Sequence, residues 1–201
     1  AGFIGSHTVD LLTHEDVKEI VIYDDFSSGS LYNLEYALKD PRVSIFDAGG
    51  DICRVDTLNA CLKGTDGVYH FAALWLRQCF EYPRSAFQVN IEGTFNVLEA
   101  CLTQKVERCV FSSSASVYGD ALEEPMNENH PLLNTSLYGA TKIACEQLFR
   151  AYYHQYGNKY VGLRYMNVYG PRQQYKGKYT AVILQMLKSI LDGREPVIYG
   201  D

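Results

Sequence analysis

The stretch Ala1-Gly-Phe-Ile-Gly-Ser-His7 places two glycines, Gly2 and Gly5, three residues apart at the start of a helical pattern. It is followed by Glu19-Ile-Val-Ile-Tyr-Asp-Asp25, an apolar run of strand length that ends on two aspartates. Glycines at the start of a helix let the backbone approach a phosphate, and the free N–H groups of the first helical turn attract negative charge. These two segments predict a strand-and-helix fold with a phosphate site beside the first helix.

The alternation of helix and strand continues along the whole chain. Strands that alternate with helices form a parallel sheet, because each right-handed crossover carries a helix. We therefore predict an α/β, doubly wound parallel sheet with helices on both faces and ligands at the carboxyl ends of its strands. Helices are predicted at 6–12, near 32–38, and at 55–62, 85–103, 136–156 and 181–191, strands at 19–23, 43–46, 67–72, 108–112 and 160–165, and a short apolar segment at 196–199.

The composition is that of a folded globular protein. Of the 201 residues, 47% are hydrophobic and 21% are charged, and the net charge of −6 comes without a run of Lys or Arg. Nucleic acids and anionic membranes bind to clusters of positive charge, so neither is an expected partner. No apolar run approaches the ~20 residues that span a bilayer, and we expect a cytoplasmic protein. The cysteines form no CxxC pair and are predicted to be reduced, mostly buried thiols: Cys53, Cys61, Cys79, Cys101, Cys109 and Cys145.

Asp24 lies at the end of the next predicted strand, about 20 residues after the glycine turn. At this sequence separation a carboxylate can accept hydrogen bonds from both hydroxyls of an adenosine ribose. Asp24 and its neighbour Asp25 would repel a 2′-phosphate, and no Arg adjoins them. The sequence therefore favours NAD over NADP. The alternative is that Asp24 only caps a turn.

The segment Tyr138-Gly-Ala-Thr-Lys142 lies downstream of three serines, Ser112 to Ser114, at the end of a predicted strand. A spacing of four places Tyr138 and Lys142 on one face of a helix. A tyrosine has a pKa of about 10, and both a nearby ammonium and an oxidised nicotinamide favour its phenolate, which predicts a tuned acid/base. Ser114 would then donate its hydroxyl to a substrate oxygen or relay its proton. The alternative is a chance YxxxK spacing and a plain serine loop.

Eight segments occur in the order and approximate spacing found in the extended short-chain dehydrogenase/reductases: AGFIGSH, YDDFSSGS, GDI, HFAA, NIEGTFNVLEA, FSSSASVYG, YGATK and RYMNVYGPR. Over essentially its whole length the sequence resembles the NAD-dependent epimerase/dehydratases of that family, most of all the UDP-glucose 4-epimerases. The resemblance implies a Rossmann-type fold, bound NAD and a nucleotide-sugar substrate such as a UDP-hexose. It also implies a homodimer formed through the two long helices.

The resemblance assigns the site residue by residue. Ser114, Tyr138 and Lys142 are the expected catalytic set, the expected substrate contacts are Ser114, Tyr138 and Asn167, and no metal is expected. The alternative is that Phe71, Ala72 and Tyr165 are packing residues and that Asn90 and Asn167 are caps or turn residues. The site interpretation is favoured, because each residue lies near the carboxyl end of a predicted strand or on a facing helix. Cofactor contacts are expected from Gly2, Phe3, Ile4, Gly5, Asp24, Asp25, Asp51, Ile52, Phe71, Ala72, Ala73, Asn90, Ser112, Tyr138, Lys142 and Tyr165.

The resemblance also implies a strand and a further glycine ahead of Ala1, and a substrate domain beyond Asp201. We therefore expect residues 1–201 to form one NAD-binding catalytic domain without its first strand, in which 166–201 begins the substrate-binding part and most of that part is missing. Loss of a central strand would leave unpaired backbone and apolar surface on its neighbours. The sequence leaves open whether Trp75, Arg77 and Gln78 shape a sugar pocket or only cover the end of the sheet.

Several reactions fit this set of residues. In a 4-epimerase, Tyr138 would take the proton of the sugar C4 hydroxyl while NAD oxidises C4, and the 4-keto sugar would turn over before it is reduced. A 4,6-dehydratase typically has Asp-Glu after a Thr where this sequence has Ser114-Ala115-Ser116, so it is less favoured. Other oxidoreductases of nucleotide sugars remain open. A noncatalytic NAD-binding protein would need no Ser, Tyr and Lys set, and is the least favoured.

Overall fold

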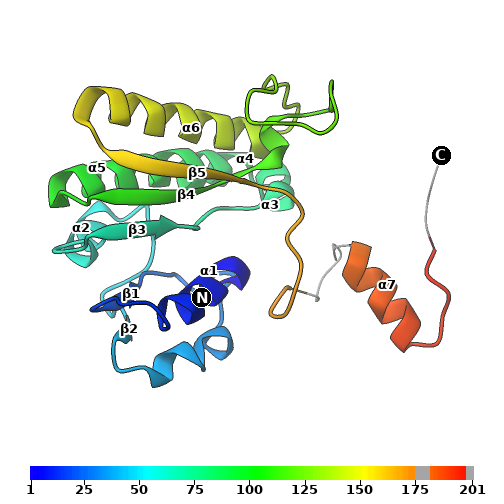
Figure 1. Cartoon of the computed structure of the whole chain (residues 1–201), viewed down its shortest axis with the longest axis horizontal. Coiled ribbons are helices and arrows are strands. Elements are labelled where there is room, and N and C mark those ends of the chain that lie inside the picture. Colours follow the sequence, from blue (N-terminus) through cyan, green and yellow to red (C-terminus); the bar gives the residue numbers. More distant parts are fainter. Residues whose placement is uncertain (175–181, 198–201) are drawn as a thin grey trace. The chain divides into compact units, whose positions relative to one another are not determined.

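The computed structural model describes residues 1–174 and 182–197, in two compact units, Ala1–Met166 and Asn167–Asp201. In the second unit, helix α7 spans Val182–Leu191. In the first unit, helices and strands alternate (Figure 1) in the order α1 (Phe3–Leu12), β1 (Ile20–Ile22), η1 (Leu31–Leu34), η2 (Ala37–Lys39), β2 (Val43–Ile45), α2 (Val55–Cys61), β3 (Gly67–His70), α3 (Leu76–Glu81), α4 (Pro83–Ala86), η3 (Phe87–Gly93), α5 (Thr94–Gln104), β4 (Arg108–Ser114), η4 (Ala115–Val117), α6 (Leu137–Tyr156) and β5 (Lys159–Tyr165).

The strands form two parallel sheets. β1 pairs with β2 from Ile20 opposite Val43, and β4 lies between β3 and β5 in a three-stranded sheet. Among the described residues, β1 and β3 are not hydrogen-bonded to each other, and no strand precedes α1. Helices and strands alternate and every strand pair is parallel, so the predicted α/β fold class is confirmed.

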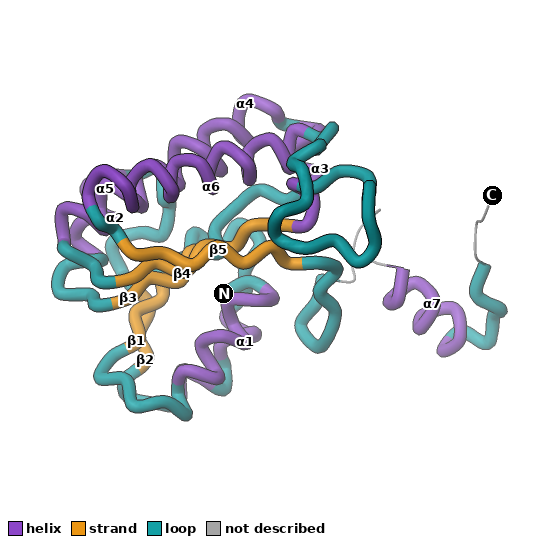
Figure 2. Tube along the Cα trace, turned by 45° about the horizontal axis from the view of Figure 1, so that its top comes forward, coloured by secondary structure: helices purple, strands orange, loops and turns teal. Residues whose placement is uncertain are grey.

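The main core lies between the sheet β3–β4–β5 and the helices α2, α5 and α6, which cover one face of it (Figure 2). Phe111 of β4 stacks on Phe149 of α6 with ring centroids 4.9 Å apart, and both side chains are fully buried. Burying one such side chain contributes about 1.5–3 kcal/mol. A smaller cluster, which includes Ile20, Leu34 and Val43, joins β1 and β2 to α1 and the 3₁₀ segments. The larger core therefore fixes α6, the helix that carries the predicted acid/base, against β4.

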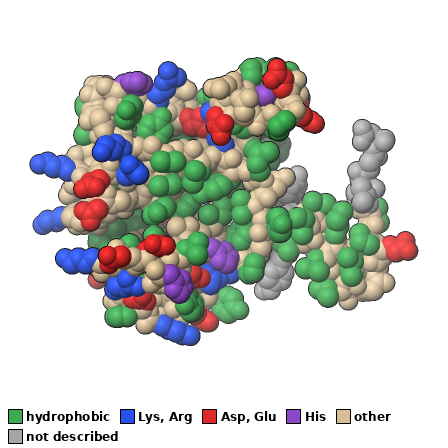
Figure 3. All heavy atoms as spheres, viewed as in Figure 1, with side chains coloured by type: hydrophobic (Ala, Val, Ile, Leu, Met, Phe, Trp, Pro, Cys, Tyr) green, Lys and Arg blue, Asp and Glu red, His purple; other side chains and the backbone are tan. Residues whose placement is uncertain are grey.

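The opposite face of β3–β4–β5 is largely uncovered within the first unit. Tyr160 and Arg164 contact α6 residues, so the alternating residues Val161 and Leu163 face the other side. Val161 and Leu163 are 41% and 37% exposed, and Tyr69 of β3 is 48% exposed. Figure 3 shows hydrophobic side chains gathered over these strands. Helices on both faces, as predicted from the alternation, are thus found on one face only for this part of the sheet.

Several predicted elements differ from the structure in extent. α1 begins at Phe3 and not at residue 6, and β4 continues through the serines to Ser114. The predicted helix at 85–103 is three segments, α4, the π-helical η3 and α5, and the helix near 32–38 is two 3₁₀ turns. α3 was not predicted, because its six residues are too few for a periodic pattern. Residues 181, 198 and 199 of the two last predicted segments lie outside the described residues.

All six cysteines are free, as predicted. Cys53 and Cys61 are half-buried and the other four are buried. In the part of the chain that the structure describes, none of the helices has the length and apolar character needed to cross a membrane.

Candidate active site

Tyr138, Lys142 and the serines of β4 come together at the carboxyl end of the central strand. Lys142 lies on α6 one turn after Tyr138, and its Nζ donates a hydrogen bond to the backbone oxygen of Ser112 at 2.7 Å. The ammonium lies 5.6 Å from the centroid of the Tyr138 ring and 4.9 Å from that of Phe111. Ser114 ends β4, and its hydroxyl lowers the pKa of the Tyr138 phenol. The structure thus brings the three predicted catalytic residues into one cluster.

Lys142 is an unusually buried ammonium, with a relative exposure of 3%. Burial lowers its pKa to about 8, although the neighbouring thiols of Cys145 and Cys79 act in the opposite direction. His70, which is also buried, shares a hydrogen bond of 2.9 Å with the Thr94 hydroxyl. Burial, followed by repulsion from Lys142, lowers the His70 pKa to about 3. His70 is therefore neutral at physiological pH, and Lys142 is the titrating cation of this cluster.

The electrostatics of Tyr138 differ from the sequence-based prediction. Burial raises the pKa of Tyr138, and the hydrogen bond with Ser114 only partly offsets that rise. Lys142 is not among the groups that shift this pKa in the protein chain alone, where its ammonium donates to the Ser112 carbonyl, and the joint effect of the ammonium and an oxidised nicotinamide stays a prediction. Deprotonation of Tyr138 would require an additional positive charge at the site, such as an oxidised nicotinamide.

Asn90 joins the segment after β3 to α6. Its side-chain oxygen accepts a hydrogen bond from the Leu74 N–H at 2.7 Å, and its amide nitrogen donates to the Leu74 oxygen at 3.0 Å and to Thr141 Oγ1 at 3.1 Å. The Cys145 thiol donates to the Asn90 backbone oxygen at 2.9 Å. Asn90 lies in η3, and π-helical turns occur frequently at functional sites. Its side chain holds the turn in place beside Lys142, and a direct contact with a cofactor stays a prediction.

The glycine turn lies beside Asp24. Gly2 is the N-cap of α1, no side chain caps this helix, and a Cβ added at Gly2 would meet nothing within 4 Å. The backbone nitrogen of Ala1 lies 2.9 Å from Asp24 Oδ2, and Oδ1 accepts a hydrogen bond from the Phe26 N–H at 2.8 Å. Asp25 accepts hydrogen bonds from the Ser27 N–H and hydroxyl. Both carboxylates therefore accept hydrogen bonds within the turn after β1, and the role of Asp24 at a ribose stays a prediction.

The backbone packs very closely around Asp24. A Cβ at Gly50 would lie 1.9 Å from the Asp24 backbone oxygen, and one at Gly29 would lie 2.9 Å from Asp24 Oδ1. Only glycine fits these approaches without a shift. The loops after β1 and β2 thus meet at Asp24, where the sequence predicts the adenosine ribose.

The other predicted cofactor residues lie along the same edge of the two sheets. Asp51 follows β2 and accepts a hydrogen bond on its backbone oxygen from the Tyr23 hydroxyl at 2.8 Å, whereas Ile52 is buried in the core. Phe71 lies 3.6 Å from the position of a Cβ on Gly5, so it packs against the first turn of α1, which contains Phe3 and Ile4. Ala72 and Ala73 follow Phe71, and Tyr165 ends β5 opposite Ser114. Asn167 belongs to the second unit, and its role stays a prediction.

The three residues whose role the sequence left open form the start of α3. The Trp75 N–H donates to Gln78 Oε1 at 3.2 Å, which caps the helix, and Arg77 pairs with Glu81 at 2.7 Å. Gln78 and Arg77 thus have local roles at the end of the sheet.

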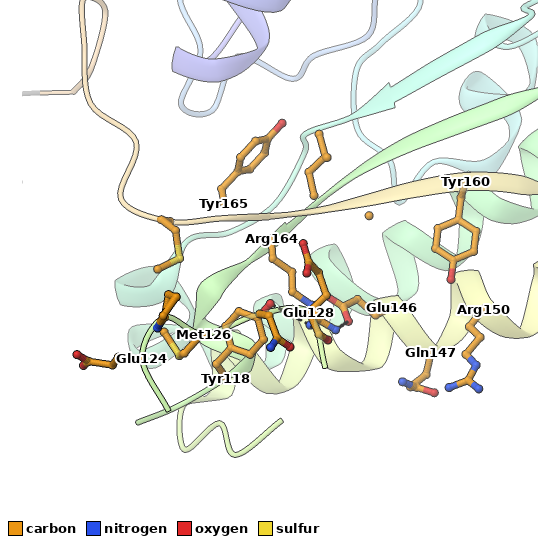
Figure 4. Close-up of a pocket in the computed structure, with 15 residues that line it drawn as sticks. Tyr118, Glu124, Met126, Glu128, Glu146, Gln147, Arg150, Tyr160, Arg164 and Tyr165 are labelled. Carbon is orange, nitrogen blue, oxygen red and sulfur yellow. Dashed lines mark hydrogen bonds and ion pairs between the residues drawn. The ribbon is translucent and has the colours of Figure 1, made fainter. Parts of the chain in front are cut away.

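Three residues next to this cluster were not predicted: Ser113, Glu146 and Arg164. Glu146 lies four residues after Lys142, the only sequence signal that could have singled it out. Glu146 and Arg164 line a cavity of about 1310 Å³ between α6, β5 and the segment 124–128 (Figure 4). Neither Tyr138 nor Lys142 lines this cavity, although Tyr165, one of the predicted cofactor residues, does.

Three features of this parallel α/β fold define a short-chain dehydrogenase/reductase type of protein. They are a glycine turn before the first helix, an acidic residue after β1, and a cluster of Ser, Tyr and Lys at the carboxyl end of the central strand. The sequence matches the NAD dependent epimerase/dehydratase family over residues 1–201, and the chain belongs to this family. The family is NAD-dependent, which confirms the predicted type of cofactor.

Individual relatives include both epimerases and dehydratases. The structure is similar to that of UDP-N-acetylglucosamine 4-epimerase from Methanobrevibacter ruminantium, with a TM-score of 0.91 and 38% identity, over 100% of this chain and 63% of that one. The sequence is 37% identical to UDP-glucose 4-epimerase of Halalkalibacterium halodurans, over 85% of this chain and 49% of the relative. It is 34% identical to dTDP-glucose 4,6-dehydratase of an Actinoplanes species, over 100% and 63%. The chain thus spans about half to two thirds of the length of these relatives.

Proposed function

We propose that this protein is a nucleotide-sugar 4-epimerase that uses bound NAD, with a UDP-hexose as substrate. The observation that carries the proposal is that Ser114, Tyr138 and the buried Lys142 ammonium lie together at the carboxyl end of β4, where Lys142 donates a hydrogen bond to the Ser112 backbone oxygen. A protein that only binds NAD has no use for a buried ammonium beside a phenol, since burying a charge is costly.

The residues present fit NAD. The uncapped first turn of α1 offers backbone N–H groups, and the open space at Gly2 leaves room for a pyrophosphate beside them. Asp24 lies next to this turn and would accept hydrogen bonds from the adenosine ribose, while Lys142 and Tyr138 would hold the nicotinamide ribose. Bound NAD would supply reversible oxidation at the sugar C4 atom.

Tyr138 would act as the acid/base and Ser114 as its relay. Tyr138 would take the proton from the C4 hydroxyl as C4 is oxidised to a ketone, and return it when the ketone is reduced from its opposite face. The two electrons that leave C4 return to C4, so the sugar undergoes no net oxidation. Ser114 would donate to the C4 oxygen and keep it in line with the phenol.

Position 115 favours epimerisation over dehydration. A 4,6-dehydratase must also remove water from the sugar, which requires an additional acid and base. Here Ser114 is followed by Ala115 and Ser116, which carry no carboxylate, and the Ser116 hydroxyl is bonded to Ser114 at 3.1 Å.

The test is to incubate the purified protein with UDP-galactose or UDP-glucose without added reductant and to follow the sugars by chromatography. We expect both substrates to reach the same equilibrium mixture. A stable 4-keto-6-deoxy product would show that the protein is a dehydratase and not an epimerase. Binding of NAD without turnover of any nucleotide sugar would show that it is only a binding protein.

We further propose that residues 1–165 form the NAD-binding catalytic domain, that 166–201 begin the substrate-binding part, and that α5 and α6 pair with a second copy of the protein. Phe95 of α5 packs edge-on against Tyr152 of α6 at 6.0 Å, and Phe95, Tyr153 and Tyr156 are 40%, 49% and 48% exposed. Exposed aromatic side chains of this kind mark interaction surfaces. A monomer in analytical ultracentrifugation would contradict the pairing.

A further inference from the structure

Glu146 continues the line of the proposed acid/base residues along α6. Lys142 follows Tyr138 by four residues and Glu146 follows Lys142 by four, so the side chains lie along one side of the helix, spaced about 6 Å apart. Lys142 donates to the backbone oxygen of Ser112, the residue before Ser113, and the hydroxyl of Ser114, the residue after it, lowers the pKa of Tyr138. Ser113 itself donates its hydroxyl to Glu146 Oε1 at 2.5 Å. Two consecutive residues of the strand, Ser112 and Ser113, therefore hold two successive turns of the helix.

Arg164 holds the same carboxylate from the neighbouring strand. It lies directly opposite Ser113 in the register of β4 and β5. Its Nε donates to Glu146 Oε1 at 3.0 Å and its Nη2 to Oε2 at 2.8 Å, a two-pronged pair that fixes orientation as well as distance. Figure 4 shows the two side chains pointing toward each other, while Tyr165 points to the other side of β5.

The remaining guanidinium nitrogen of Arg164, Nη1, reaches the segment that follows Ser114. Arg164 Nη1 donates to the Tyr118 hydroxyl at 3.1 Å and to the Glu128 backbone oxygen at 3.0 Å, and the guanidinium lies 4.9 Å from the centroid of the Tyr118 ring. Tyr118 directly follows η4, four residues after Ser114. One ion pair thus links α6, β4, β5 and the segment that leaves the candidate site.

The carboxylate is ionised within this network. Burial by itself raises the pKa of Glu146, but the hydrogen bonds from Arg164 and Ser113 outweigh it and hold the pKa below its ordinary value. The Glu146 and Arg164 side chains are only 14% and 20% exposed. Desolvation offsets much of the attraction in such a pair, so a gain in stability is a weak reason for its presence.

We propose that Glu146, held by Arg164 and Ser113, is a positioning residue that sets the rotation and height of α6 on β4 and thereby places Tyr138 and Lys142 against Ser114. This inference rests on the proposed function. Its consequence is that loss of the Glu146 carboxylate impairs the chemical step even when the protein remains folded, because a shift of about 1 Å at reacting groups costs up to about 10²-fold in rate.

The experiment compares Glu146→Ala, Glu146→Gln and the control Asp40→Asn in the purified full-length protein. Asp40 pairs with Arg42 at 2.7 Å with side-chain exposures of 20% and 32%, so the control removes a similar ion pair from the β2 end of the molecule. The kcat and KM for UDP-glucose and the Kd for NAD are measured at a temperature at which circular dichroism shows every variant to be folded.

We expect Glu146→Ala to lower kcat at least about 10-fold while KM changes less than about 3-fold, and Glu146→Gln to restore part of kcat because its amide oxygen can still accept a hydrogen bond. Asp40→Asn should change neither constant. An unchanged kcat in Glu146→Ala, with only a lower melting temperature, would show that the pair merely stabilises the fold.

The failure of the proposed function gives a different result. In that case the wild-type protein itself does not interconvert the sugars. The Kd for NAD then tests whether Glu146 positions Lys142 and Tyr138. Weaker NAD binding in Glu146→Ala than in Asp40→Asn supports positioning of Lys142 and Tyr138, and equal binding in the two variants overturns it.

Discussion

The Lys142 ammonium and the Ser112 backbone oxygen, 30 residues apart in the chain, are joined by a hydrogen bond of 2.7 Å. The acceptor is a main-chain atom, so this anchor does not depend on the side chain at position 112. It satisfies one proton of a buried ammonium and directs the amine toward the end of β4. The contact explains how an apolar surrounding that includes Phe111 can hold a cation next to Tyr138.

Tyr138→Phe should abolish the proposed acid/base step without unfolding the protein. Positioned acid/base groups contribute about 10²–10⁴-fold, and we expect kcat for UDP-galactose to fall by about 10³-fold. The folded fraction, followed by circular dichroism, should change little, because the ring that packs in the structure is retained. Tyr153→Phe, an exposed residue of the same helix, serves as the control. Wild-type kcat in Tyr138→Phe would remove this residue from the mechanism.

The burial of Lys142 predicts a rise in stability with pH. Its folded pKa is about 8, below the value of an exposed lysine of about 10.4, so the unfolded chain binds more protons between these limits. Below pH 8 the buried charge lowers the free energy of unfolding by its full amount. This loss becomes smaller as the pH rises through the folded pKa, because Lys142 becomes neutral in the folded protein. Lys142→Met should lack this rise, which amounts to about 2 kcal/mol between pH 7 and 9.5. Urea unfolding at several pH values measures it, and parallel curves for both proteins would contradict the prediction.

Gly2→Ala should separate cofactor binding from folding. Gly2 has φ −73° and ψ −175°, which any residue adopts, and an added Cβ meets nothing in the protein. We expect an unchanged melting temperature but at least about 10-fold weaker NAD binding in a fluorescence titration, because the methyl group enters the space proposed for the pyrophosphate. Gly162→Ala, which also has open space around its Cβ, should affect neither property. Undiminished NAD binding in Gly2→Ala would exclude this turn as the phosphate site.

Gly139→Ala should disturb both stability and catalysis. Gly139 lies between Tyr138 and Lys142, and a Cβ there would come within 2.0 Å of Asn134 Oδ1 and 2.4 Å of the Ser116 backbone oxygen. Relief of such overlap typically costs about 1–3 kcal/mol. The first turn of α6 must move away from the segment after Ser114, so kcat should fall together with the melting temperature. A variant with wild-type melting temperature and kcat would show that this close approach is not required.

Local spacing accounts for what the sequence alone could predict about the site. Tyr138 and Lys142 lie one helical turn apart, and Asp24 ends a strand that is visible as an apolar run. The carboxyl ends of parallel strands meet at one edge of a sheet, so Ser114 could be placed there from its strand alone.

The positioning network could not be predicted, because its contacts join residues that are far apart in the chain. Ser113 and Glu146 are 33 residues apart, and Glu146 and Arg164 are 18 apart. Which side of the helix meets which residue of the strand depends on the packing of Phe111 on Phe149, which no periodic pattern encodes. The π-helical turn at Asn90 was missed because its residues have the same apolar spacing as an ordinary helix.

That wide turn constrains the length of the chain as well as its residues. Each residue of an α-helix advances the chain by about 100°, so removing one residue between Phe87 and Gly93 would convert the π turn into ordinary turns and swing the preceding α4 around the helix axis relative to α5. Either Asn90 would then point away from Leu74, or α4 would be displaced from its present position. Substitutions in this stretch are therefore easier to accommodate than a deletion of a single codon.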